Sequence, residues 1–260
     1  FTFDLATKVI QFLQKTYDEA MQKPLQEETV SEDQEFKDVV LGLENVKEEI
    51  SSIATHINMQ VKRGSTLSLQ QQGNHYIFTG NPGTGKTTVA RIMADVFRSL
   101  GVVKEGQLIE ADRSSMVAGF AGQTAIKTNQ LIDKALGGVL FIDEAYTICS
   151  GENDTYGKEA LDTLLKRLED DRGRFICIVA GYTKEMHTFI EANPGLKSRF
   201  TKTIHFEDYT PTELQQIFIR LATKNNFKMT AETQSALLHH FEKVYATRTT
   251  GFGNARDVRS

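Results

Sequence analysis

The 260-residue sequence has no long apolar run, no marked excess of either charge and only two cysteines. Its apolar runs are far shorter than the roughly 20 residues that a membrane-spanning helix needs. No secretory signal pattern opens the chain. The formal net charge of −4 gives no electrostatic footprint for general binding to nucleic acid or to a membrane surface. These absences argue against a membrane-spanning protein and against a general nucleic-acid binder.

Internal repeats and clusters of metal ligands are also missing from the sequence. Cys149 and Cys177 have neither metal-binding nor redox spacing, so we expect a reducing, cytoplasmic location. The histidines form no metal-ligand constellation. With 40% hydrophobic and 25% charged residues, the composition allows a full-sized core and a smaller companion domain. Because the chain begins with Phe1 and stops inside a helical pattern, we expect it to be part of a longer protein.

The most informative feature is a glycine-rich loop between a strand pattern and a helix pattern. Residues 75–79 read as a short buried strand, and apolar residues recur at helical spacing from Val89 to Leu100. The intervening Gly-x4-Gly-Lys-Thr spacing is that of a loop whose backbone N–H groups cradle phosphates. In this motif Lys86 reaches the β- and γ-phosphates, and the Thr87 hydroxyl binds Mg²⁺. The expected nucleotide-binding residues of the loop are Asn81, Pro82, Gly83, Thr84, Gly85, Lys86, Thr87 and Thr88.

A second signature is the apolar strand 139–142, which ends in two adjacent carboxylates, Asp143 and Glu144. The carboxyl ends of parallel strands are where open α/β folds bind ligands. Asp143 is expected to hold Mg²⁺, and Glu144 to act as the catalytic base that takes a proton from the attacking water. The adjacent Asp-Glu pair indicates an ATPase, and the sequence has no Asn-Lys-x-Asp guanine motif.

Helix and strand patterns divide the chain into three parts. Residues 1–35 read as a helix and an acidic linker, 36–208 as an α/β nucleotide-binding domain, and 209–260 as a truncated helical lid subdomain. A capping box at Thr210–Glu213 opens the lid. The expected strands lie at 75–79, 107–111, 139–142, 175–180 and 203–206, and the expected helices include 43–61 and 158–169. The alternation indicates a parallel sheet of the P-loop NTPase class.

Residues from about 36 to 260 resemble the AAA+ ATPases of the CbbX/CfxQ/SpoVK group, which includes the red-type Rubisco activases and stage V sporulation protein K. Several of the matching stretches lie outside the general nucleotide motifs, which makes the resemblance specific to this group. The stretches are GNPGTGKTTVAR, ALGGVLFIDEAY, YGKEALDTLLKRLED, IVAGY, ANPGLKSRF and GNARDVR. The resemblance implies a P-loop core followed by a helical lid, with ATP and Mg²⁺ as ligands.

The resemblance also implies roles that spacing alone does not assign. Arg199 matches the catalytic arginine finger, which reaches the nucleotide of a neighbouring subunit, and Arg256 matches the arginine that ties the lid to the phosphates. The segment Val40, Gly42 and Leu43 matches the wall of the adenine pocket. Phe120, Ala121 and Gly122 match a pore loop that grips polypeptide, although the family often has tyrosine and a larger aliphatic residue there.

One family position departs from the usual pattern. Many AAA+ proteins end the fourth strand with Asn or Thr, which orients the attacking water. Here the strand ends in Ala180-Gly181-Tyr182-Thr183, which leaves Tyr182 and Thr183 as alternatives.

The function implied is an ATPase that works as a ring, expected to be a hexamer, and remodels a protein client. The alternative is an ATP-gated assembly scaffold that threads no substrate. A DNA-acting ATPase such as a clamp loader is disfavoured by the acidic balance of the chain. The aromatic ring of Phe120 separates the first two, because gripping a client requires it and scaffolding does not.

Overall fold

The computed structural model describes residues 43–62, 75–120, 122–151, 153–249 and 251–259. The expected N-terminal helix and linker, the loop 63–74, and the site residues Val40, Gly42 and Ala121 lie outside the described residues. Among the described helices, none is long and apolar enough to cross a membrane.

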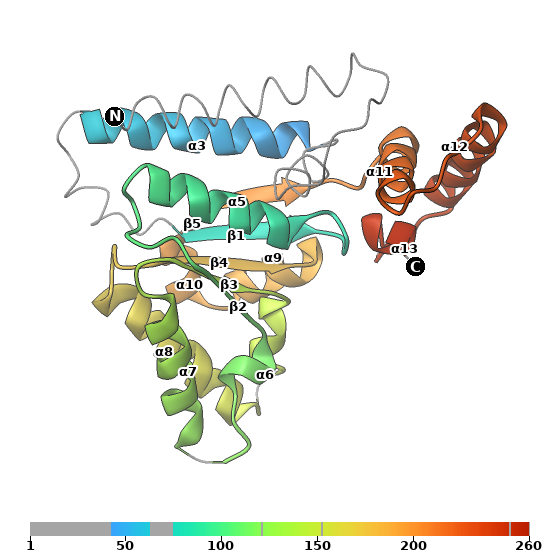
Figure 1. Ribbon diagram of the computed structural model, residues 1–260. Coiled ribbons are helices and arrows are strands. Elements are labelled where there is room, and N and C mark those ends of the chain that lie inside the picture. The colour runs from blue at the N-terminus through green and yellow to red at the C-terminus, as the bar shows by residue number, and fades with distance from the viewer. Residues whose placement is uncertain (1–42, 63–74, 121, 152, 250, 260) are drawn as a thin grey trace.

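A five-stranded parallel sheet forms the centre of the molecule, with strand order β2-β3-β4-β1-β5 (Figure 1). β3 and β4 are buried along their whole length, because helices cover both faces of the sheet. The strands are β1 (His75–Gly80), β2 (Leu108–Ala111), β3 (Val139–Ile142), β4 (Ile176–Gly181) and β5 (Phe200–Phe206).

Helices pack on both faces of the sheet, and the sheet separates the core into two layers (Figure 1). Alternate strand residues face opposite layers: Phe78 and Phe141 pack with α3 and α5, whereas Ile77 and Leu140 pack on the other side. The first face carries α3 (Glu44–Lys62) and α5 (Lys86–Ser99). The second carries α7 (Gln123–Ala135), α8 (Thr155–Asp170), α9 (Thr183–Glu191) and α10 (Pro194–Arg199).

Two short helices and the lid complete the fold. α6 (Arg113–Met116) follows β2, and the 3₁₀ helix η1 (Ala145–Ile148) follows β3. The lid consists of α11 (Pro211–Lys224), α12 (Ala231–Ala246) and α13 (Ala255–Arg259), beside one end of the sheet (Figure 1). The predicted capping box is confirmed, since the Thr210 side chain accepts from the N–H of Glu213.

The predicted strands occur where expected, with one boundary clearly wrong. β5 begins at Phe200, three residues before the predicted start at Thr203. Phe200 pairs with His75 and Lys202 with Tyr76, so pairing with β1 extends the strand through the polar residues Thr201 and Lys202. The other strands differ from the prediction by no more than one residue at either end.

Candidate active site

The glycine-rich loop joins β1 to α5, as its sequence context predicted. Gly83 and Gly85 have positive φ angles of 70° and 89°, conformations that glycine adopts without strain. The Lys86 ammonium donates to the carbonyl oxygens of Gly80 and Asn81 at 2.9 and 2.7 Å. Burial lowers the pKa of Lys86 to about 8, an effect opposed mainly by the charge of Asp143.

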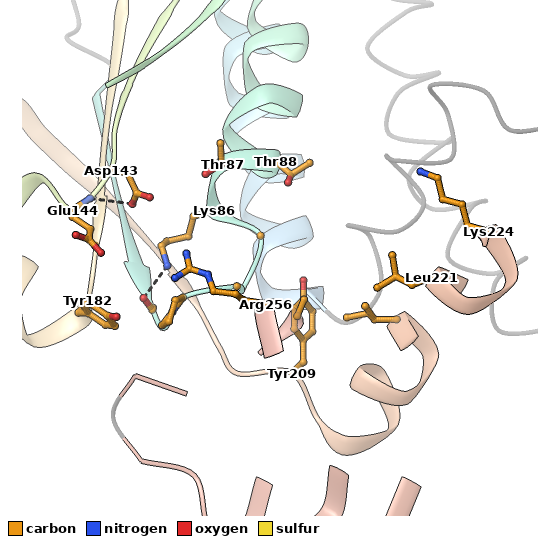
Figure 2. A pocket seen from close by; sticks show the side chains of 17 residues that line it. Lys86, Thr87, Thr88, Asp143, Glu144, Tyr182, Tyr209, Leu221, Lys224 and Arg256 are labelled. Atoms are coloured by element: carbon orange, nitrogen blue, oxygen red, sulfur yellow. Dashed lines mark hydrogen bonds between the residues drawn. The ribbon is translucent and has the colours of Figure 1, made fainter. Parts of the chain in front are cut away.

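Asp143 and Glu144 follow β3 directly, at the same edge of the sheet as the loop (Figure 2). Glu144 has a φ of 46°, in the left-handed region that a non-glycine residue seldom adopts. Its backbone is held there because the N–H and hydroxyl of Thr147 donate to the Glu144 carbonyl at 2.8 and 2.7 Å. The Glu144 N–H donates to the Asp143 carboxylate at 3.0 Å. These bonds hold the Glu144 backbone and orient the Asp143 carboxylate.

The lid contacts the loop through Asn254, which is fully buried. Its amide nitrogen donates to the Asp208 carboxylate at 2.8 Å, and its amide oxygen accepts from the Tyr209 N–H at 2.8 Å. The Ala255 N–H donates to the Gly83 carbonyl at 3.2 Å. A Cβ atom on Gly83 would lie 2.1 Å from the Gly253 carbonyl oxygen, so this approach requires glycine. The start of α13 is therefore fastened directly to the glycine-rich loop.

A cavity of about 490 Å³ lies between the sheet edge and the lid (Figure 2). That size is within the range of small-molecule sites. The expected site residues that line it are Pro82, Gly83, Gly85, Lys86, Thr87, Thr88, Asp143, Glu144 and Arg256. The other lining residues are Gly80, Gly181, Tyr182, Tyr209, Ile217, Leu221, Lys224 and Ala255. Sequence reasoning missed the contribution of α11, whose apolar spacing predicts a packed helix face and gives no sign of a ligand.

Three of the expected nucleotide-binding residues are not among the residues that line this cavity. Asn81 donates at 2.8 Å to the Asp208 carboxylate, which also accepts from Asn254 of the lid, so Asp208 links the loop to the lid. The Thr84 hydroxyl is buried and donates to the Asn81 carbonyl at 2.8 Å. Leu43 packs in the core with α5. The side chains of Asn81 and Thr84 therefore shape the loop, and only their backbone groups are left to contact a ligand.

Arg199 lies at the end of α10, outside the cavity of its own chain. Its guanidinium donates to the Gly195 carbonyl at 3.1 Å and pairs with Glu169 at 3.3 Å. Phe120 stands 72% exposed, just before Gly122, where α7 begins. Neither residue lines this chain's own cavity.

A parallel sheet that carries a phosphate loop and a carboxylate pair at one edge, with a helical lid beside them, defines a P-loop NTPase. Residues 76–208 match the family described as "ATPase family associated with various cellular activities (AAA)", and residues 210–260 match an AAA lid domain. The chain belongs to this AAA family, and the nucleotide chemistry of its catalytic unit is ATP hydrolysis.

Curated relatives place the chain more closely within the family. It is 43% identical over 223 residues to stage V sporulation protein K of Bacillus subtilis, covering 85% of this chain and 69% of that protein. It is 45% identical over 193 residues to the ESX-1 secretion system protein EccA1 of Mycolicibacterium smegmatis, covering 73% of this chain and 34% of EccA1. It is 41% identical to the chloroplastic ribulose bisphosphate carboxylase/oxygenase activase of Cyanidioschyzon merolae, covering 85% of this chain and 75% of that protein. The chain thus spans about a third of EccA1.

Solved structures share the fold at lower identity. A RuvB structure from Thermotoga maritima superposes with a TM-score of 0.56 at 23% identity, covering 84% of this chain and 59% of RuvB. The FIGL-1 AAA domain in complex with ADP gives a TM-score of 0.55 at 19% identity, covering 84% and 68%. At this identity the likeness supports the fold alone.

Proposed function

We propose that the chain is one subunit of a hexameric, cytoplasmic ring that couples ATP hydrolysis to the remodelling of a protein client. The observation that carries the proposal is a second cavity, of about 750 Å³, which Glu144 shares with the segment before Phe120. Val117, Ala118 and Gly119 line it together with Asp143 and Glu144. The carboxylates and the segment that leads to the exposed Phe120 therefore border the same space, so a change at the carboxylates on hydrolysis would alter the surroundings of that segment.

ATP binds between the sheet edge and the lid in this proposal. The loop N–H groups and the Lys86 ammonium hold the phosphates, and Arg256 reaches them from α13, which ties lid position to nucleotide state. The hydroxyl of Thr87 and the carboxylate of Asp143 are oxygen donors suited to Mg²⁺ and line the same cavity; bound Mg²⁺ would neutralise phosphate charge. Glu144 takes a proton from the attacking water. In this proposal Val40, Gly42 and Leu43 form the adenine wall, and Leu43 contributes through its backbone because its side chain packs in the core.

Arg199 completes the site of a neighbouring subunit. Its planar guanidinium suits the charge that develops on the transferring γ-phosphoryl group. In the single chain it is held outside the cavity through Gly195 and Glu169, at the end of α10. A finger supplied in this way makes turnover depend on ring assembly.

Phe120 grips the client in this proposal. An aromatic ring offers a large surface that tolerates many peptide sequences, and the side chain is 72% exposed, an unusual state for phenylalanine. Gly122, with a φ of 77°, ends the segment and opens α7. Together, Phe120, Ala121 and Gly122 form the pore loop.

The test compares Phe120→Ala with Phe227→Ala in the full-length protein. Phe227 is a matched control, because it is also exposed, at 67%, but lies in the lid between α11 and α12. ATP turnover is measured with and without casein, an unfolded polypeptide. We expect casein to stimulate the parent and Phe227→Ala, whereas Phe120→Ala keeps basal turnover without stimulation.

Equal stimulation of Phe120→Ala and the parent would overturn the gripping role and favour the ATP-gated scaffold. No stimulation of any of the three proteins would count against a grip that tolerates many sequences. Thermal melting checks the fold, and we expect both variants to melt with the parent because both side chains are exposed.

A further inference from the structure

The end of β4 has no room for the side chain that many AAA+ proteins carry there. Gly181 is the last residue of β4 and is buried. A Cβ atom on it would lie 2.7 and 2.8 Å from Cε1 and Cδ1 of the Tyr146 ring, and 3.0 Å from Cγ of Met186. Such contacts are closer than real Cβ atoms make, so the Tyr146 ring occupies the space that an Asn or Thr side chain would need at this position.

Tyr146 belongs to η1 and follows Glu144 by two residues. Its ring centroid lies 6.2 Å from that of Tyr182, with the ring planes 43° apart, a tilted aromatic contact. Burial, with the nearby Glu144 charge, raises the pKa of Tyr146 to about 12, so its hydroxyl stays protonated. The Tyr146 ring therefore packs against both Gly181 and Tyr182.

Tyr182 and Thr183 were the two candidates at the strand end, and the structure separates them. Tyr182 lines the cavity between the sheet edge and the lid together with Lys86, Asp143 and Glu144 (Figure 2). Thr183 is exposed in the first turn of α9 and is not among the residues that line the cavity. Tyr182 is thus the first side chain after β4 that faces the phosphate loop.

We propose that Tyr182 orients the attacking water beside Glu144, and that Tyr146 is a positioning residue that holds the Tyr182 ring in place. This proposal rests on the base role proposed for Glu144. The phenolic oxygen of Tyr182 accepts one water hydrogen, and the Glu144 carboxylate accepts the other. The water oxygen then bonds to the γ-phosphorus as the bond to ADP breaks, and the proton passes to Glu144. The phenol gains and loses no proton.

This arrangement predicts different results for the two tyrosines. Tyr182→Phe keeps the ring but removes the water acceptor, so kcat should fall at least about tenfold, less than the roughly hundredfold expected for a lost base. KM and the Kd for ATP should stay within about twofold, because the hydroxyl acts on the water and not on bound nucleotide. Tyr146→Phe should retain turnover, since only its ring is needed, whereas Tyr146→Leu should lose as much as Tyr182→Phe.

The experiment measures steady-state ATP turnover and calorimetric ATP binding for these variants in the full-length protein. Thr183→Val is the matched control and should behave like the parent. A Tyr182→Phe variant that keeps kcat within about twofold of the parent would overturn the proposal. So would a Tyr146→Phe variant as slow as Tyr146→Leu, because the hydroxyl of Tyr146 would then be the important group.

Glu144→Gln separates this proposal from the one it rests on. Slow turnover of both Glu144→Gln and Tyr182→Phe, with ATP binding intact, supports both. Normal turnover of Glu144→Gln removes the base on which the water geometry depends, whatever Tyr182→Phe does. Slow turnover of Glu144→Gln with normal turnover of Tyr182→Phe overturns the role of Tyr182 alone.

Discussion

Lys86 has a lowered pKa before nucleotide binds, so its side chain loses its proton more readily than an ordinary lysine. Burial is the main reason that its pKa falls from the ordinary 10.5 to about 8, and the Arg256 charge adds to the decrease. Phosphate oxygens act in the opposite direction, because a nearby negative charge favours the ammonium form. Binding of ATP should therefore raise the pKa of Lys86 and draw a proton from solution at alkaline pH.

Calorimetry of ATP binding in two buffers with different ionisation enthalpies measures this proton uptake. At about pH 8.5 we expect different apparent enthalpies in the two buffers, since much of the Lys86 population is neutral before binding. At about pH 6.5 Lys86 is already charged and contributes no uptake, which provides an internal control. Equal enthalpies at the alkaline pH would contradict the lowered pKa.

Where several site residues belong to one sequence motif, the spacing of that motif predicted that their side chains meet at the cavity. Lys86 and Thr87 belong to one loop, and Asp143 and Glu144 to one strand end, so local order fixes their relation. Tyr146 could not be predicted in the same way, because its packing against Gly181 depends on how β3 and β4 pair. Asn254 sits in a stretch that resembles the family, yet its contact with Asp208 spans 46 residues.

At the level of elements, Arg113 joins α6, η1 and α8. Its guanidinium donates to the carbonyl oxygens of Thr147, at 2.9 Å, and of Ile148, and pairs with the Asp154 carboxylate. Hydrogen bonding to Arg113 holds the pKa of Asp154 well below its usual range. Asp154 also caps α8, accepting from the Gly157 N–H at 2.9 Å. The strained backbone at Glu144 is thus supported from the far end of η1.

We expect Arg113→Ala to lower both stability and turnover while ATP binding persists. Three acceptors lose their donor, and Asp154 loses its counter-charge, so the cost should exceed the roughly 1 kcal/mol typical of a lost hydrogen bond. Urea unfolding and ATP turnover measure the two effects. Arg91→Ala is the matched control, since the Arg91–Glu110 pair is 2.8 Å long but exposed, and such pairs contribute at most about 1 kcal/mol. Equal stability of the two variants would contradict the structural role of Arg113.

Strand prediction worked best where both faces are buried. β3 and β4 consist almost wholly of apolar residues, which mark central strands of a parallel sheet. β5 lies at the sheet edge and pairs only with β1, so polar residues such as Lys202 occur in it and conceal its start. The pattern of alternating strands and helices predicted a parallel sheet, whereas the order β2-β3-β4-β1-β5 comes from tertiary pairing that periodicity does not encode.

At the level of the whole molecule, one network of hydrogen bonds joins the lid to the sheet edge. Asn254 bonds to both Asp208 and the Tyr209 backbone, and Asn81 reaches the same carboxylate from the phosphate loop. A change in the phosphate loop on nucleotide binding would be transmitted to the start of α13 through these bonds. In the division of labour that we propose, Arg199, which lies outside its own cavity, serves a neighbouring subunit.

Mixing two inactive variants tests most directly whether neighbouring subunits complete each other's sites. Arg199→Ala lacks the finger but keeps Glu144, and Glu144→Gln lacks the base but keeps Arg199. Each alone should bind ATP and hydrolyse it at least about a hundredfold more slowly than the parent. In a mixed ring some interfaces join an intact base to an intact finger, so the mixture should turn over ATP well above the sum of its separate components. Activity no greater than that sum, from subunits shown to co-assemble, would contradict the shared site.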